Sequence, residues 1–265
     1  LVAWASFFSA RGDARATVVA FEPMNRSRNA FLIEAYRSLG LLAESQAGRG
    51  LTVRAAPHWN EAALSTAADQ MAEAGGLDHR GWAWPMHKPI FVACLRVGAR
   101  IIGANLDANE ARDIARRGAS ALAPDLQRTL DADRGWSASE QRAAETEIDH
   151  GHCGLLPPAR WPSMVLAQRA RDAAMAQVMV QASDRRRQRV VLIAGNGHVR
   201  RDLGVPRSLL ALGLRPRDLH SVAYRETPAQ SMAQPEPGVG DRFDQVIYTT
   251  AVDRADPCKG LAGRL

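Results

Sequence analysis

The feature that most constrains the fold of this chain is a set of short, uniformly apolar runs, each bounded by breaker residues. The runs read as buried strands at residues 17–21, 100–104, 190–194, 219–223 and 245–249. Strands that are apolar at every position are typical of parallel sheets covered on both faces. Helical patterns separate most of the runs, as in consecutive β–α–β units. We therefore expect an α/β fold with a parallel sheet of about five strands flanked by helices.

Helical periodicity predicts the elements between the strands. The expected helices span residues 29–42, 60–74, 89–97, 109–117, 137–150 and 163–183. Ser137 with Glu140 three residues on is a capping-box pattern at a helix start. Residues 109–183 contain no convincing strand, so we expect a small helical subdomain there. Residues 1–108 and 184–265 would then form the sheet domain.

Charge and composition limit the classes of partner. The chain has 265 residues, is 46 % hydrophobic and carries a net charge of +6, nearly all of its cations being arginine. The arginines are scattered apart from the run at 185–189, which has no stacking aromatic residues beside it. A nucleic-acid partner is therefore not expected.

The sequence carries no sign of a membrane span or a disulfide framework. No apolar run is long enough to cross a bilayer, and residues 1–8 lack the charged start and cleavage pattern of a signal peptide. Cys94, Cys153 and Cys258 are odd in number and have no metal-like spacing. They neither require nor exclude an oxidising compartment.

The sharpest local motif is an apolar strand that runs into Gly195, Asn196, Gly197 and His198. Glycines permit positive φ and a close approach of the backbone to a ligand. Open α/β folds bind ligands at the carboxyl ends of their strands. His198 could ligate a metal, move a proton or hydrogen-bond a bound group, or simply bond a loop carbonyl.

Polar residues also close two other predicted strands. Glu22 ends the first strand ahead of a proline, and Asn105 ends the second. Either side chain could face a ligand at the same edge of the sheet, or only cap a helix or fix a turn. We expect the carboxylate of Glu22 and the imidazole of His198 to open into a shared cavity.

The longest predicted helix carries a mixed face. Gln168 and Arg171 lie within an apolar stripe at helical spacing, which suggests a helix covering a site. The methionines of that stripe, Met175 and Met179, are interpreted as core residues. Arg171 with Asp172 could be only a surface pair.

Histidines surround a glycine turn at residues 150–154. His150 and His152 lie two residues apart, which does not place them on one helix face, and no further zinc ligands can be named. No metal site is therefore predicted there. His152 remains a candidate ligand-binding residue because glycines flank its turn.

At these residues the chain resembles the ChaN-like haem-binding proteins, which share a superfamily with the Tiki proteases and the erythromycin esterases. The similar segments run nearly end to end: 19–22 with 25–26, 81–84 with 89–90, 104–106, 151–157, 164–168 with 171–172 and 175–176, 193–200 with 204–206, and 256–258. Gly195 to His198 resembles the second of the superfamily's two GxxH motifs.

The resemblance implies a parallel sheet with a small helical domain. It also implies haem binding linked to iron uptake, often in a lipoprotein of the cell envelope (outer membrane or periplasm) that pairs into a homodimer. Any contact with the membrane would then run through a lipid anchor that this chain does not contain. The ligand-binding residues expected are Gly195, Asn196, Gly197, His198, Arg200, Glu22, Asn105, His152, Gln168 and Arg171.

Two features depart from the family pattern. The first GxxH motif, a GExH turn expected near residues 1–10, is absent, so half of the superfamily's paired site is missing. The family is also known for a tyrosine ligand to haem, but no matching motif selects among the tyrosines of this chain. Tyr36, on the helix after the first strand, and His198 are the axial-ligand candidates.

Three functions remain open. The first is a non-enzymatic haem-binding protein in haem or iron acquisition. The second is a metal-dependent hydrolase of the Tiki or erythromycin-esterase type built from Glu22, His152 and His198, with metal-bound water as nucleophile. The absence of the GExH turn weighs against it, because a catalytic metal usually needs three protein ligands. The third is a folded remnant with no ligand.

Overall fold

The computed structural model describes residues 2–6, 17–43, 52–79, 82–133, 135–183, 188–228, 240–252 and 256–260. The chain forms two compact units. Unit 1 comprises Leu1–Trp4, Ala108–Ala176 and Gly195–Leu265, and unit 2 comprises Ala5–Asp107 and Gln177–Ala194. The domain division expected from the sequence stays a prediction.

Short helices and strands make up both units. Unit 2 holds β2 (Thr17–Asn25), α1 (Asn29–Ser38), β3 (Leu42–Ala43), β4 (Thr52–Val53), α2 (Glu61–Ala74), α3 (Trp84–Val97) and β5 (Arg100–Asn105). Unit 1 holds α4 (Ala108–Arg117), α5 (Pro124–Ala132), α6 (Ala138–Gly151), α8 (Asn196–Val199), α9 (Val205–Ala211), β7 (His220–Thr227) and β8 (Gln245–Thr250). The chain passes between the units within β1 (Val2–Ser6), α7 (Trp161–Ala182) and β6 (Arg189–Gly195).

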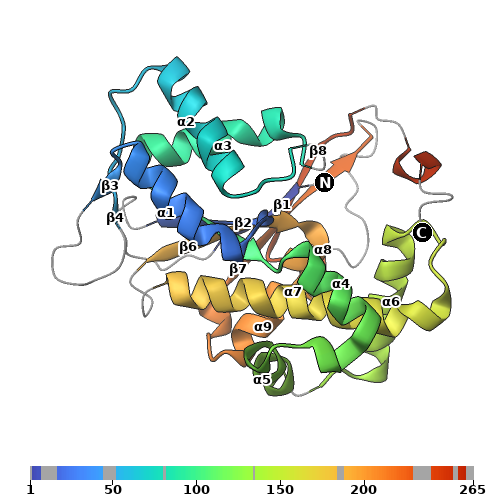
Figure 1. Cartoon of the computed structure of the whole chain (residues 1–265). Coiled ribbons are helices and arrows are strands. Elements are labelled where there is room, and N and C mark those ends of the chain that lie inside the picture. The colour runs from blue at the N-terminus through green and yellow to red at the C-terminus, as the bar shows by residue number, and fades with distance from the viewer. Residues whose placement is uncertain are drawn as a thin grey trace. The chain divides into compact units, whose positions relative to one another are not determined.

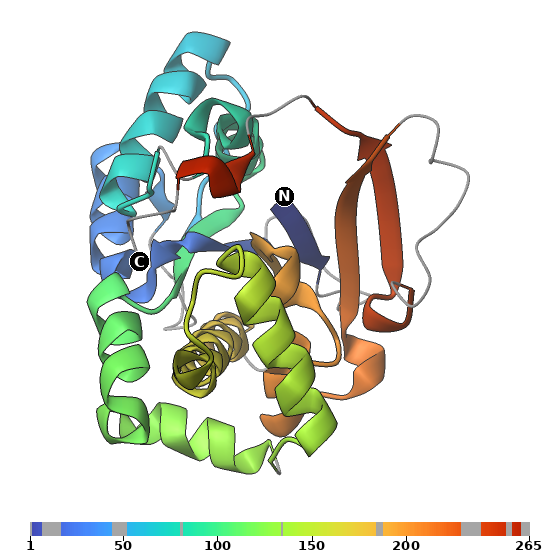
Figure 2. The same ribbon diagram turned by 90° about the vertical axis from the view of Figure 1, so that its right-hand side faces the viewer.

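The parallel sheet of unit 2 has three strands in the order β5–β2–β6. Val19 of β2 pairs with Ile101 of β5, and Ala20 pairs with Leu192 of β6. All five predicted strands form, but β7 and β8 pair in parallel with each other in unit 1 (Figure 2). The expected sheet of about five strands is therefore too large. β8 has no fully buried residue, whereas the sequence pattern alone suggested strands covered on both faces.

Aromatic side chains fill the core of unit 2. The ring of Phe21 on β2 lies 4.6 Å from that of Phe91 on α3, and the ring of Trp84 lies 4.9 Å from Phe91. Helices α2 and α3 lie side by side (Figure 1). A Cβ at Gly103 of β5 would lie 2.4 Å from the carbonyl oxygen of Asn25, so only glycine allows the close approach of β5 and β2 there.

Most helices lie where the sequence predicts them, but their first and last residues differ from the prediction. The capping box at Ser137 and Glu140 is present and begins α6 as predicted. Helix α3 begins at Trp84 rather than at residue 89, because a proline in the first turn is compatible with a helix. Pro89, where the helix was expected to begin, lies inside the helix. Helix α5 was not predicted. No described helix is both long and apolar enough to span a bilayer.

A polar cluster holds Trp136 in unit 1. The indole nitrogen of Trp136 donates to Asp133 at 2.8 Å, and the guanidinium groups of Arg169 and Arg207 lie 4.5 Å and 5.4 Å from its ring centroid. Arg207 also forms ion pairs with Asp133 and with Glu140. Cation–π contacts and charge-assisted hydrogen bonds therefore fix the indole from both its edge and its face.

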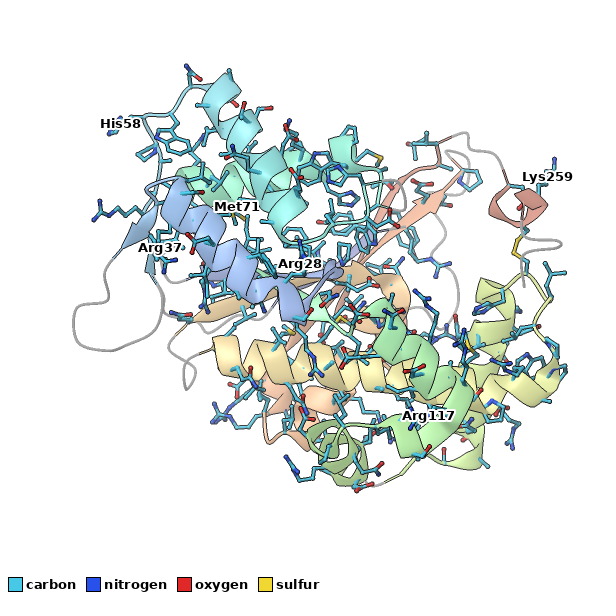
Figure 3. The ribbon with its side chains drawn as sticks, viewed as in Figure 1. Arg28, Arg37, His58, Met71, Arg117 and Lys259 are labelled. Carbon is cyan, nitrogen blue, oxygen red and sulfur yellow. A yellow bond between two sulfur atoms is a disulfide. The ribbon has the colours of Figure 1, made fainter. Side chains whose placement is uncertain are left out.

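A disulfide joins Cys153 to Cys258 across 105 residues of sequence in unit 1. Figure 3 shows it as a yellow bond beside the short helix that carries Lys259. Cys94 is a free, buried thiol in unit 2, and burial raises its pKa to about 12. The sequence did not predict this pairing, because spacing alone does not reveal which cysteines meet.

Tyr36 of α1 lies in the core of unit 2. It is 2 % exposed, and its hydroxyl oxygen accepts a hydrogen bond from the backbone nitrogen of Ile101 at 2.8 Å and lies 3.5 Å from the carbonyl oxygen of Ala99. Burial raises the pKa of its phenol well above the ordinary value. The hydroxyl therefore attaches α1 to the start of β5.

We expect Tyr36→Phe to lower the free energy of unfolding by about 1–3 kcal/mol, because the buried N–H of Ile101 loses its acceptor. Urea denaturation followed by circular dichroism measures the change. Tyr248→Phe is the matched control, since that hydroxyl makes no hydrogen bond within the described residues. Equal effects of the two substitutions would show that the Tyr36 hydroxyl has no such role.

The ion pair at Glu140 makes a pH-dependent contribution to stability. Hydrogen bonds from the backbone and side chain of Ser137, and then from Arg207, lower the pKa of Glu140 to about 2. A depressed folded-state pKa stabilises the protein above the unfolded-state value near 4.5, and this stabilisation is lost as pH falls towards 2.

We expect Glu140→Gln, which can keep the helix cap but not the charge, to be less stable than the unaltered protein at pH 7. The difference should shrink between about pH 4.5 and 2. Urea unfolding at a series of pH values measures it. Glu145→Gln is the control, because Glu145 accepts from Gln141 rather than from an arginine. A difference that stays constant over this range would contradict the assignment.

Candidate functional site

The predicted glycine turn after β6 is a single helical turn. Gly195 has φ −62° and ψ 152°, and neither it nor Gly197 adopts the positive φ that a glycine permits. Helix α8 instead carries His198 into the interior, where it is 5 % exposed. A Cβ at Gly204 would lie 2.3 Å from the carbonyl oxygen of His198, so this glycine allows the chain to fold back against α8.

The imidazole of His198 is paired with a buried carboxylate. Its Nδ1 lies 2.6 Å from Oδ1 of Asp172 on α7, and Asp172 is 2 % exposed. An ionised carboxylate only accepts hydrogen bonds, so Nδ1 carries a proton, and in the neutral imidazole Nε2 carries the lone pair. The same arrangement orients histidines in catalytic and metal sites.

Gln168 and Arg171 extend this pair into a hydrogen-bonded chain. Nε2 of Gln168 lies 3.1 Å from Nδ1 and 3.3 Å from Nε2 of His198. A guanidinium nitrogen of Arg171 donates to Oε1 of Gln168 at 3.3 Å, which turns the amide nitrogen towards the imidazole. Since Asp172 holds the Nδ1 proton, the amide N–H of Gln168 can donate to the lone pair of Nε2.

Helical spacing explains why these side chains meet. Gln168, Arg171 and Asp172 stand at positions i, i+3 and i+4 of α7 and therefore lie on one face. The sequence predicted a site under Gln168 and Arg171 but treated Asp172 as a possible surface partner of Arg171. That interpretation is wrong, because Asp172 is buried. Met175 and Met179 of the same helix are core residues, as predicted.

A cavity of about 240 Å³ lies next to this network within unit 1. Apolar side chains form much of its wall: Trp136, Ala144, Ile148, Val165 and Leu203. Glu147, His152, Gln168 and Arg200 add polar groups, and Gly197 contributes backbone. The cavity therefore combines an apolar lining with imidazole, amide, carboxylate and guanidinium groups, which is typical of a small-molecule site.

Arg200 is fixed by carboxylates at the edge of this cavity. It is 5 % exposed and donates to both oxygens of Asp202, at 2.9 and 2.6 Å, and to Glu147 at 2.7 Å. Burial opposes ionisation of Asp202, but the hydrogen bonds from Arg200 outweigh it and lower the pKa of that carboxyl group. The guanidinium is thus a fixed cation, already neutralised by two acids.

His152 stands at the end of α6 and lines the cavity. Its Nδ1 lies 2.7 Å from the carbonyl oxygen of Ile148, one turn earlier in the helix. The next residue, Cys153, has φ +60° and forms the disulfide. The predicted turn of glycines and histidines is thus a helix end that a covalent bond attaches to the C-terminal segment.

The remaining predicted site residues belong to unit 2. Glu22 and Asn105 are each 8 % exposed, and Oδ1 of Asn105 accepts from the backbone nitrogen of Leu106 at 2.8 Å. The shared cavity of Glu22 and His198 stays a prediction, since it joins residues of different units. Tyr36 is held in the core by backbone hydrogen bonds, an arrangement unsuited to a ligand of haem iron.

Within the parts of the chain that the structure describes, no three His, Cys, Asp or Glu side chains gather in a metal-binding group. The hydrolase set of Glu22, His152 and His198 crosses the two units and stays a prediction. The observed chemistry of unit 1 is therefore an oriented imidazole network beside an apolar cavity.

Comparison with known proteins identifies the chain's relatives. No curated protein matches it. The solved structure of ChaN from Campylobacter jejuni, described as showing cofacial heme binding, is 18 % identical with a TM-score of 0.54, and the likeness covers 80 % of this chain and 68 % of that one. This similarity shows the fold. The family model described as haem-binding uptake, Tiki superfamily, ChaN matches residues 9–209. Because that match spans most of the sequence, the chain belongs to the ChaN family of haem-binding uptake proteins.

Proposed function

We propose that this chain binds haem in unit 1, with one edge of the macrocycle in the cavity beside His198. The observation that carries the proposal is the apolar cavity lined by His152 and Gln168. Haem requires an apolar slot, a donor for its iron and polar or cationic groups for its propionates. Membership of a haem-binding uptake family supports the same ligand.

The residues present fit an edge of a haem. A cavity of about 240 Å³ is somewhat smaller than sites that enclose a drug-sized ligand, about 300–1,000 Å³. The rest of the macrocycle would then extend beyond these walls, where residues 195–197 of the same unit remain proposed contacts. Bound haem supplies an iron atom that accepts axial ligands, while this chain's side chains bind and orient it.

Arg171 is a cation that stands beside the cavity wall. It is half-buried and contacts Gln168, which lines the cavity. Arg200 lines the cavity and binds Asp202 and Glu147, so we assign it to the shape of the wall. We therefore assign Arg171 to propionate binding, because a guanidinium group matches carboxylate geometry.

We further propose a non-enzymatic role in haem or iron acquisition at the cell envelope, in a homodimeric lipoprotein. The disulfide between Cys153 and Cys258 supports a location outside the reducing cytosol. Cell-envelope compartments such as the periplasm allow such bonds to form and persist.

We expect one reactive thiol per chain in denaturant without reductant, because only Cys94 is free. Three thiols should react after reduction, since the sequence has 3 cysteines. A thiol assay on protein purified from an oxidising compartment measures both values. Three reactive thiols before reduction would contradict the disulfide and remove its support for an envelope location.

We expect haemin titrated into the protein to give a saturable, shifted Soret band. Ala144→Phe should weaken this binding about tenfold or more, a loss of at least ~1.4 kcal/mol, because the new ring occupies the cavity. Ala143→Phe on the exposed face of the same helix is the matched control. Circular dichroism verifies that both variants fold.

Two results would contradict the proposal. An unchanged spectrum of the unaltered protein at micromolar haemin would remove haem binding altogether. Equal haemin affinity of Ala144→Phe and Ala143→Phe would show that haem binds elsewhere on the chain.

A further inference from the structure

We infer that the disulfide between Cys153 and Cys258 is a redox latch, which an external dithiol opens while unit 1 stays folded. The bond ties the C-terminal strap, residues 256–260, to the end of α6. This attachment lies one residue from His152 of the cavity wall. The inference does not depend on haem binding, because it concerns a covalent bond that the chain forms with itself.

The strap has few contacts besides the disulfide. Its described hydrogen bonds are internal, since the backbone nitrogens of Cys258 and Lys259 donate to the carboxylate and the carbonyl oxygen of Asp256. Asp256 and Lys259 are exposed, and within the described residues no hydrogen bond or ion pair joins them to another element. A segment with so few interactions opens locally at a low free-energy cost once its covalent attachment is broken.

The other half of the bond belongs to a well-ordered helix end. Cys153 follows His152 at the end of α6, with φ +60°. Its backbone nitrogen donates to the carbonyl oxygen of His150 at 3.1 Å, and that of Gly154 donates to Asp149 at 2.9 Å. These bonds satisfy the last carbonyls of the helix without the strap. We therefore expect the end of α6 to persist when the disulfide opens.

The packing of α6 is also independent of the disulfide. Ala144 of this helix forms an apolar cluster with Val165 and Leu203, and Trp136 and Ile148 pack against it. Neither cysteine belongs to the cluster. Reduction should consequently release the strap and leave the helix packed in unit 1, which distinguishes a latch from a disulfide that holds a fold together.

Thiol–disulfide exchange supplies the chemistry of opening. Both cysteines are half-buried rather than enclosed. A thiolate of the dithiol attacks Sγ of Cys153, the S–S bond breaks, and Cys258 leaves as a thiolate that takes up a proton. The second thiol of the dithiol then displaces Cys153, which is also protonated. The dithiol is thereby oxidised to a disulfide, and two electrons and two protons pass to the protein.

Cys258 is the better leaving group of the two. A thiolate at Cys153 would meet the partial negative charge at the C-terminal end of α6, which disfavours it. Cys258 instead has Lys259 as its neighbour in the chain, and a nearby lysine favours a thiolate. Attack on Cys153 is therefore favoured.

A lysine-specific endopeptidase tests the state of the strap, because Lys88 and Lys259 are the only lysines of the sequence. Lys88 precedes a proline inside α3, a bond that such enzymes cut poorly, so cleavage reports on Lys259. The oxidised full chain should be cut slowly. After treatment with dithiothreitol and alkylation, the loss of residues 260–265, measured by mass spectrometry, should be about tenfold or more faster. Circular dichroism should be the same in both states.

Two variants separate the latch from other effects of reductant. Cys258→Ser should be cut at the fast rate with or without dithiothreitol, because its strap is never attached. Cys94→Ala is the matched control, since it removes the free thiol and keeps the disulfide. Its cleavage should still depend on reductant.

Three results would overturn the inference. A disulfide that resists dithiothreitol until the protein is denatured is not exchangeable. An unchanged cleavage rate at Lys259 after reduction would show that other contacts hold the strap. Loss of the folded circular dichroism spectrum in the reduced protein and in Cys258→Ser would show that the bond holds unit 1 together instead.

Discussion

The buried pair of His198 and Asp172 is the interaction on which the arrangement of unit 1 depends. A carboxylate at 2 % exposure is very costly unless it is hydrogen-bonded, and the imidazole of His198 supplies that hydrogen bond. The imidazole on α8 therefore has to face α7, and this contact brings the segment after β6 against the helix. Gln168, one turn before Asp172, is placed at the cavity wall by the same requirement.

Two different kinds of interaction hold the wall of the cavity in place. On one side, the polar cluster around Trp136 fixes a large apolar surface with arginines and carboxylates. On the other, the end of α6 is held covalently by Cys153, so His152 is presented from a restrained position. A flat apolar ligand with a metal centre needs both features, a rigid wall and an oriented donor.

The sequence predicted the features that short-range patterns encode. The capping box of α6 and the five apolar strands follow from local chemistry, and both are present. Strand partners depend on long-range packing, so the pattern overstated the sheet of unit 2. Asp172 was misjudged because an acid beside an arginine resembles a surface pair, although its spacing of four from Gln168 marked the same helix face. The spacing of the cysteines does not reveal which residue pairs with Cys153, because its partner lies 105 residues away.

The central claim is that Asp172 holds the imidazole of His198 in a single tautomer beside the cavity. Long-range ¹H–¹⁵N NMR of the histidine rings tests it directly, because it reports which nitrogen carries the proton. The account predicts Nδ1–H for both His152 and His198 in the free protein. A ring of His198 that is protonated at Nε2 and not at Nδ1 would contradict it.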